Sequence, residues 1–161
     1  MKESRLLKAV ISAVGAALCI WTLAAVDHSF SGNWLLMAPF GATMVLIFGV
    51  HHSPLAQPKN VVFGHLITAA VGLLFVNTLA VTPLTLGIAV GFGLFLMLLL
   101  DVPHPPAGGN PLLLMMGGHH DWMFLLHPVL LGSVATVILA TCYHRLIPGH
   151  IYPYKMEEPK L

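Results

Sequence analysis

The segment from Asp101 to Pro111 (Asp-Val-Pro-His-Pro-Pro-Ala-Gly-Gly-Asn-Pro) interrupts one of the most hydrophobic stretches of the chain. A long apolar run ends at Leu100, and another begins at Leu112. The prolines and glycines of the segment prevent a continuous backbone hydrogen-bond ladder. Inside a bilayer, irregular backbone is tolerated only where it is buried in protein or lines a polar cavity. Discontinuous helices of this kind therefore indicate a transport site.

The composition indicates a protein that lies in a membrane rather than in water. Hydrophobic residues make up 57% of the 161 residues and charged residues only 8%, whereas a soluble domain carries about 25% charged residues. We therefore predict an integral membrane protein with one transmembrane domain, residues 1–161, and short cytoplasmic tails at 1–5 and 146–161. The net charge of +1 argues against a nucleic-acid partner, which would require a concentrated basic patch.

The apolar runs predict about six membrane segments, since a span needs about 20 apolar residues. Four runs are long enough or nearly so: Leu6–Val26, Val61–Val81, Leu84–Leu100 and Trp122–His144. Two others are compromised, because 34–50 contains Pro39 and Gly41 and 105–117 is short and opens with two prolines. The predicted fold class is all-α, a polytopic membrane protein in which two segments are short or broken half-helices.

Two topologies are compatible with these segments. If all six reach across the membrane, all seven lysines and arginines lie on one side. If the two broken segments are instead re-entrant, Lys59 moves to the opposite side. The positive-inside rule favours the first topology. It predicts that Lys2, Lys59 and Arg145 are cytoplasmic, with both termini inside, and we expect the location to be the bacterial inner (plasma) membrane.

The two broken segments resemble each other. Pro39-Phe-Gly-Ala-Thr-Met-Val-Leu46 aligns with Pro106-Ala-Gly-Gly-Asn-Pro-Leu-Leu113, and His52 then matches His119. The order span, broken segment, span occurs twice, and three crossings per unit would invert the second unit. Inverted repeats with paired broken helices recur among transporters. We therefore predict that the two broken segments approach each other and line one cavity.

The break at Pro105–Pro111 predicts an anion site. Asn110-Pro111 is typical of a helix start, with asparagine as the N-cap and proline in the first turn. A helix start offers backbone N–H donors and a partial positive charge to a small anion. Asp101 and His104 are three residues apart, so they would meet if the helix continued. Because histidine side chains ordinarily titrate near neutral pH, His104 would carry a proton together with the anion.

The turn between the second and third segments contains Ser53-Pro54, Gln57-Pro58 and Lys59. Lys59 would attract anions by its field. The alternative interpretation is a solvated cytoplasmic turn.

The chain has ten histidines, and these suggest an alternative function. His65, His127 and His144 lie on predicted spans, where they would serve a haem- or metal-binding membrane redox protein. Their spacing is not that of haem proteins, and no Cys-x-x-Cys-His motif occurs in the sequence. The pairs at 51–52 and 119–120 suggest at most a surface metal site. No nucleophile–base pattern is visible, so we expect neither an enzyme nor a cofactor.

Three motifs resemble the HPP family of integral membrane proteins. They are His104-Pro-Pro-Ala-Gly-Gly-Asn-Pro111, Pro39-Phe-Gly-Ala42, and Ser53-Pro-Leu-Ala-Gln-Pro-Lys-Asn60 with Gly64-His65. One departure is Gly109, where the family usually has alanine. The resemblance implies transport of nitrite, by a channel or a proton-coupled carrier.

The candidate pathway combines the two broken segments with the turn between them. Its partners would be a small inorganic anion and the lipid bilayer, and we expect a homo-oligomer because a chain this small needs neighbours to enclose a polar path. The candidate residues are Pro39, Phe40, Gly41, Thr43, Ser53, Gln57, Asn60, His65, Asp101, His104, Pro105, Pro106, Ala107, Gly108, Gly109 and Asn110.

Overall fold

A computed structural model describes residues 5–30 and 35–154, and within these ranges every regular element is a helix. The longer helices are α1 (Arg5–Ser29), α3 (Pro58–Thr78), α4 (Pro83–Leu99) and α6 (Leu131–Arg145). A 3₁₀ turn, Trp122–Leu125, and a π turn, Leu126–Leu130, extend α6 towards its N-terminus. The short helices are α2 (Pro39–Met44), which continues as a π turn (Val45–Gly49), and α5 (Asn110–Gly117), which follows a 3₁₀ turn (Pro105–Gly109). A further 3₁₀ turn spans Pro54–Ala56.

These elements confirm the all-α polytopic class. Three helical stretches are long and apolar enough to cross a membrane: Arg5–Ser29, Pro58–Thr78 and Trp122–Arg145. The helix α4 has 17 residues, or about 26 Å at 1.5 Å per residue, close to the hydrocarbon thickness of about 30 Å. Its outer face carries Leu84, Ile88, Leu98 and Leu99, all more than 45% exposed. An apolar surface of this size fits lipid rather than water.

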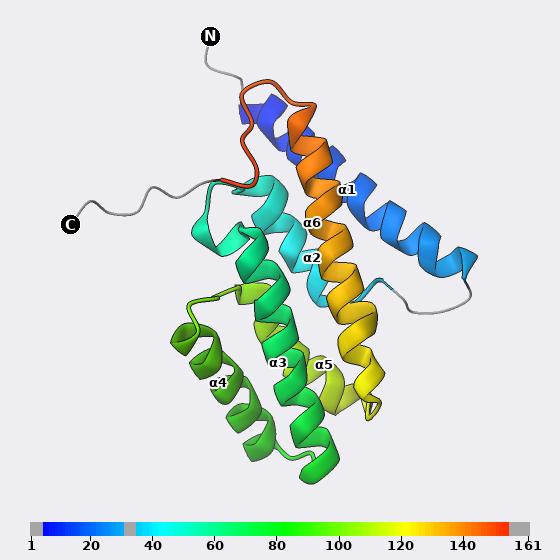
Figure 1. The fold of residues 1–161 in the computed structure, drawn as a ribbon, viewed down its shortest axis with the longest axis vertical. Coiled ribbons are helices and arrows are strands. Elements are labelled where there is room, and N and C mark those ends of the chain that lie inside the picture. Colours follow the sequence, from blue (N-terminus) through cyan, green and yellow to red (C-terminus); the bar gives the residue numbers. More distant parts are fainter. Residues whose placement is uncertain (1–4, 31–34, 155–161) are drawn as a thin grey trace, which may run out of the picture.

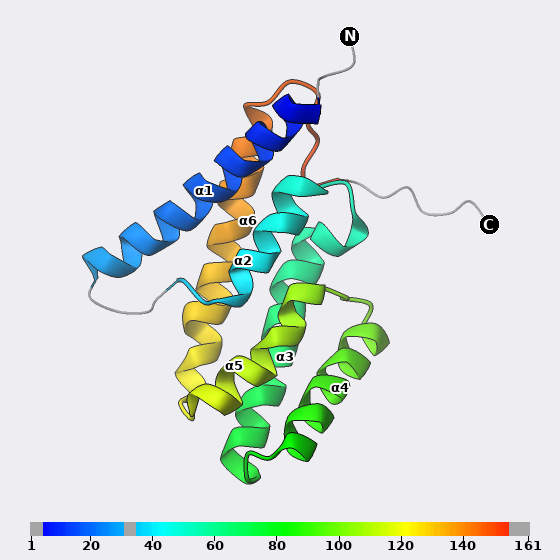
Figure 2. The ribbon, with the colours of Figure 1, turned by 180° about the vertical axis from the view of Figure 1, so that it is seen from behind.

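The helices alternate in direction along the bundle (Figure 1). The half-helix α2 begins near the middle of the bundle and runs towards the end where α3 starts and α6 finishes. The half-helix α5, seen from behind in Figure 2, also begins near the middle but runs towards the opposite end. The starts of the two half-helices therefore meet inside the bundle and point in opposite directions.

Each half-helix packs closely on a glycine of the long helix in the other half of the chain. A Cβ atom added at Gly72 of α3 would lie 2.9 Å from the Cα of Pro111 in α5. A Cβ atom added at Gly132 of α6 would lie 2.5 Å from a ring carbon of Phe40 in α2. Both positions need glycine because the nearest atom is backbone in each case, Pro111 Cα at Gly72 and the Leu35 carbonyl oxygen at Gly132. This exchange of partners is what an inverted repeat predicts.

The basic residues that the structure describes lie at one end of the bundle, where α1 and α3 begin and α6 ends (Figure 1). They are Arg5, Lys8, Lys59 and Arg145. This is the arrangement that the six-segment topology requires. Lys2 lies outside the described residues.

The chain after α6 folds back at this same end instead of extending away as a tail. The hydroxyl of Tyr152 donates to the carbonyl oxygen of Ala56 at 3.0 Å, and the side chain of Tyr152 is buried. The described part of the expected C-terminal tail, residues 146–154, thus packs on the turn that precedes α3.

Candidate functional site

Five buried polar side chains join the two half-helix starts to α3. We call this set the polar cluster; it consists of Thr43, His65, Thr68, His104 and Asn110, each at most 1% exposed. Thr43 comes from α2, His65 and Thr68 from α3, His104 from the residue before the 3₁₀ turn, and Asn110 from the start of α5. The expected approach of the two broken segments is therefore seen directly in these side chains.

Hydrogen bonds determine where the protons sit in this cluster. The Nδ1 atom of His104 lies 2.8 Å from the carbonyl oxygen of Leu55, and since a carbonyl can only accept, Nδ1 carries a hydrogen. In the neutral ring Nε2 then accepts, and the Thr43 hydroxyl donates to it at 3.0 Å. Having given up its one hydrogen, the Thr43 oxygen accepts from His65 Nε2 at 3.0 Å. With both rings neutral, the hydrogen is thus on Nδ1 of His104 and on Nε2 of His65; the carbonyl of Pro39, at 3.4 Å, is the more distant acceptor for the Thr43 hydroxyl.

Asn110 completes the chain. Its amide nitrogen donates to Nδ1 of His65 at 3.1 Å and lies 3.0 Å from the carbonyl oxygen of His65. That carbonyl accepts and never donates, so it fixes which end of the amide is nitrogen. Four hydrogen bonds therefore follow one another with the same donor-to-acceptor direction: Asn110 to His65, His65 to Thr43, Thr43 to His104, and His104 to Leu55.

One atom of the polar cluster has no partner. The amide oxygen of Asn110 is buried and accepts no hydrogen bond from the residues that the structure describes. A buried acceptor without a donor costs about 1–3 kcal/mol, so such atoms in native proteins call for an explanation. In the neutral state, therefore, the unused group of the cluster is an acceptor, and its donors are already engaged.

Two residues that the sequence did not single out as site residues are part of this arrangement. A Cβ atom added at Gly64 would lie 2.8 Å from Cβ of His104, so glycine at this position lets His104 approach α3. Thr68 lies 3.0 Å from the Asn110 amide nitrogen and donates to the carbonyl of Gly64 at 2.8 Å. Their signals were present: Gly64 precedes His65 in a family motif, and Thr68 follows His65 by three residues on one helix face.

The expected row of free backbone donors is not what the helix starts present. Asn110 is not the N-cap of α5: it has helical φ and ψ of −62° and −44°, and the cap residue Gly109 makes no side-chain cap bond. The N–H of Ala107 donates to the carbonyl of His104 at 2.9 Å, and that of Asn110 donates to Ala107. The 3₁₀ turn before α5 uses these donors, and Pro105 and Pro106 have none.

The backbone N–H donors at the start of α2 are also engaged in hydrogen bonds. The N–H groups of Phe40 and Gly41 donate to the carbonyls of Met37 and Ala38, each at 3.0 Å. Small or prolyl residues nevertheless keep the surface beside the polar cluster open. A Cβ atom added at Gly41 or at Gly108 would meet nothing within 4 Å, while at Gly109 it would lie 3.8 Å from Cγ of Pro39.

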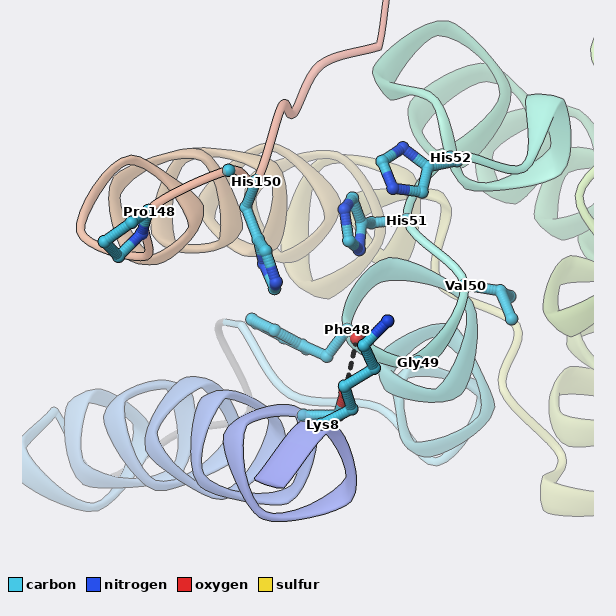
Figure 3. A pocket seen from close by; sticks show the side chains of 10 residues that line it. Lys8, Phe48, Gly49, Val50, His51, His52, Pro148 and His150 are labelled. Carbon is cyan, nitrogen blue, oxygen red and sulfur yellow. Dashed lines mark hydrogen bonds between the residues drawn. The ribbon is translucent and has the colours of Figure 1, made fainter. Parts of the chain in front are cut away.

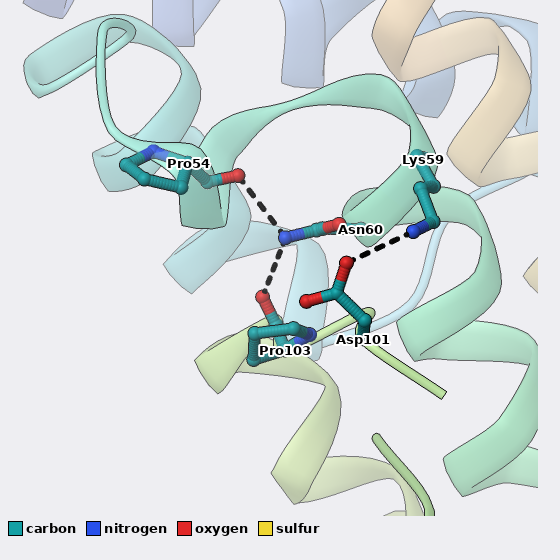
Figure 4. Close-up of polar contacts among 5 residues, drawn as sticks. All are labelled: Pro54, Lys59, Asn60, Asp101 and Pro103. Atoms are coloured by element: carbon teal, nitrogen blue, oxygen red, sulfur yellow. Dashed lines mark hydrogen bonds and ion pairs between the residues drawn. The ribbon is translucent and has the colours of Figure 1, made fainter. Parts of the chain in front are cut away.

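Asp101 and His104 do not form the expected pair. Helix α4 ends at Leu99 and Asp101 adopts a positive φ of 54°, so the chain turns and the helical three-residue spacing no longer applies. The Asp101 side chain is 92% exposed and pairs with Lys59, with 3.3 Å between Nζ and Oδ2 (Figure 4). His104 instead points into the bundle.

The polar residues of the turn before α3 hold loops together. The amide of Asn60 donates to the carbonyls of Pro54 and Pro103, both at 3.1 Å, and so joins the two motif-bearing loops (Figure 4). The amide of Gln57 donates to the carbonyl of Ser53 at 2.8 Å, and the Ser53 hydroxyl caps the short 3₁₀ turn at Leu55. These residues position His104 through Leu55.

His65, the most central of the candidate haem ligands, is not available to bind a haem. Both ring nitrogens of His65 are engaged, one with Thr43 and one with Asn110, so neither is available as an axial ligand. His144 also donates from Nε2 to the carbonyl of Ile47 at 2.9 Å. His127 lies at a non-helical bend between Leu125 and α6.

Comparisons with known proteins agree with this architecture. Residues 1–153 match the family model described as HPP, transmembrane region. Two curated transmembrane proteins of Dictyostelium discoideum are similar: one is 33% identical over 126 residues, covering 74% of this chain and 44% of the relative. The other is 34% identical over 125 residues, covering 73% and 40%. The chain thus spans less than half the length of these relatives. No solved structure shows a significant match.

Proposed function

Because this chain belongs to the HPP transmembrane family, we propose that it transports a small monovalent anion such as nitrite across a membrane. The observation that carries the proposal is the meeting of two half-helix starts around the buried polar cluster. Paired broken helices that meet inside a bundle form the substrate site in many transporters. Buried ionisable side chains in such a bundle are costly, which makes them candidates for a functional role.

The directions of the hydrogen bonds favour a proton-coupled carrier over a channel. Nitrite has acceptor oxygens only, and the neutral cluster has its donors engaged and one acceptor, the oxygen of Asn110, unused. A proton added to His65 or His104 turns an acceptor nitrogen into a donor and introduces a positive charge. The anion then gains both a partner and a countercharge. Anion binding and protonation would therefore occur together.

The surface beside the cluster supports a homo-oligomer. Gly41 and Pro105 are exposed, whereas Thr43 and His104 beside them in the sequence are buried. A path that runs along these small residues needs a second wall to exclude lipid. A neighbouring copy packed against this strip would supply it, as small residues commonly do at helix contacts in membranes.

Uptake into liposomes tests the proposal. Purified protein is reconstituted, and nitrite entry is measured with and without an inward proton gradient, using protein-free liposomes to correct for passive entry of nitrous acid. We expect the gradient to accelerate entry through the wild-type protein. His104→Gln keeps a hydrogen-bonding group but cannot hold the proton, so it should lose the response to the gradient.

A matched control is His120→Gln, which changes an exposed histidine at the opposite end of the bundle and should transport as the wild type does. Wild-type entry no faster than in protein-free liposomes would refute anion transport. Entry that ignores the gradient would refute proton coupling and favour a channel.

A further inference from the structure

A second group of histidines lies at the basic end of the bundle, away from the polar cluster. His51 follows the π turn after α2, His144 is in the last turn of α6, and His150 is in the segment that folds back after α6. One ring nitrogen from each lies within 4.8 Å of the others. The sequence brings them from positions up to 99 residues apart, from 51 to 150.

We infer that His51, His144 and His150 form a binding site for a divalent transition-metal ion of the zinc class. Imidazole nitrogens bind such ions at about 2.0–2.1 Å, so ligand nitrogens around one ion lie roughly 3–4 Å apart. The nitrogens of His144 and His150 are already 3.0 Å apart. Small shifts of the rings would bring the third nitrogen into the same sphere.

The protonation of His144 suits a ligand. Its Nε2 donates to the carbonyl of Ile47 at 2.9 Å, and since a carbonyl only accepts, the hydrogen of the neutral ring is on Nε2. The Nδ1 atom then carries the lone pair and accepts a hydrogen from Nδ1 of His150 at 3.0 Å. An ion would take the place of that hydrogen, which moves to Nε2 of His150. Metal-binding histidines usually donate their other N–H to a carbonyl or carboxylate in this way, which fixes the tautomer and the ring orientation.

His51 supplies an independent indication. Its Nε2 atom is buried and has no hydrogen-bond partner among the described residues, while the residue as a whole is 8% exposed. The ring centroid of His51 lies 4.5 Å from that of His144 and 4.6 Å from that of His150. The three imidazoles are therefore in contact and make a ready ligand set.

A cavity gives access to this site. It has a volume of about 370 Å³, and its lining includes His51 and His150 together with Lys8 and Ser12 of α1. Figure 3 shows His51 and His150 on the wall of the cavity. Three protein ligands leave a fourth position open towards the cavity for water or an anion, as in zinc sites that are not closed by protein. Lys8 would favour an anion there.

The folded-back segment gives the site its third ligand. Tyr152 anchors this segment through its hydroxyl bond to Ala56, and the N–H of Tyr154 donates to the Gln57 side chain at 2.8 Å. His150 is thus held between the end of α6 and the turn before α3. A bound ion would link these two elements and the end of the α2 segment.

Titration of the purified full chain with Zn²⁺ tests the inference. The protein is produced without a histidine tag for this experiment. Binding is measured by calorimetry in competition with a chelator. We expect one Zn²⁺ per chain in the wild type. His150→Ala and His51→Ala should each weaken binding by more than about 100-fold, since even the loss of a supporting hydrogen bond costs roughly 10- to 100-fold. His144 is left unchanged because its ring packs in the core.

Co²⁺ provides a second readout, because its visible absorption reports nitrogen coordination in place of Zn²⁺. The wild type and the control His120→Ala should show the same spectrum, and His150→Ala should lose it. A wild-type protein that binds no stoichiometric Zn²⁺ would overturn the inference. So would titrations of His51→Ala and His150→Ala that superimpose on that of the wild type.

Discussion

Replacing Thr43 by valine tests the hydrogen-bond chain at its centre. Valine has nearly the shape of threonine but no hydroxyl, and Thr43 is fully buried. The change leaves the N–H of His65 without an acceptor and Nε2 of His104 without a donor. Each buried orphan costs about 1–3 kcal/mol, so the free energy of unfolding should fall by about 2–6 kcal/mol.

The matched variant is Thr43→Ser, which keeps the hydroxyl and removes one methyl group. Its cost should be about 1 kcal/mol, the value of one buried methyl. Thr78→Val is a second control, since that hydroxyl is exposed and bonds within its own helix; the change should stay within about 0.5 kcal/mol. Reversible unfolding in mixed micelles measures all three. If the valine variant is as stable as the serine variant, the Thr43 hydroxyl does not link the two histidines as described.

Three further changes have definite expected outcomes. Gly64→Ala places a Cβ atom 2.8 Å from the side chain of the motif histidine and should destabilise by about 1–3 kcal/mol, whereas Gly41→Ala meets nothing within 4 Å and should unfold like the wild type. Cysteines at Lys59 and Arg145 should react with an impermeant reagent from the same, cytoplasmic side, and labelling of one from outside would contradict the topology. His51 has a folded-state pKa of about 4 against 6.5 for the free side chain, so the unfolded chain binds the extra proton as the pH falls through this window. Stability should therefore decline from pH 6.5 to about 4, less steeply after His51→Phe, and an unchanged slope in a pH series of unfolding curves would refute this.

The sequence predicts most of the fold because its signals are local. Apolar runs of the right length predict helices, and the paired breaks at Pro39 and Pro105 predict that two half-helices meet. The prediction of Asn110 as an N-cap is wrong, although Asn-Pro usually marks a helix start. The 3₁₀ turn directly before Asn110 extends the helical backbone towards the N-terminus, and the Asn110 amide bonds to His65 instead. Helical spacing also fails for Asp101, since the chain leaves the helix there.

The rest depends on contacts between distant parts of the chain. Local pattern does not reveal that Thr43 lies between two imidazoles, or that His51 and His150 share a cavity. These pairings arise only when α2, α3 and α6 pack. The tautomers of the histidines are even harder to predict from the sequence, because they depend on which carbonyl each ring contacts in the folded protein.

The single hydroxyl hydrogen of Thr43 also limits how the protons can be arranged at the centre of the bundle. A hydroxyl has a single hydrogen, so it can donate to one imidazole at a time, and the two rings beside it can never hold equivalent states. The reverse order would place the Nδ1 lone pair of His104 against the carbonyl oxygen of Leu55, and an N–H of His65 against the amide nitrogen of Asn110. The neutral cluster therefore has one ordered arrangement, with a fixed dipole that runs from Asn110 to Leu55, because the carbonyl oxygens at its two ends exclude the reverse order.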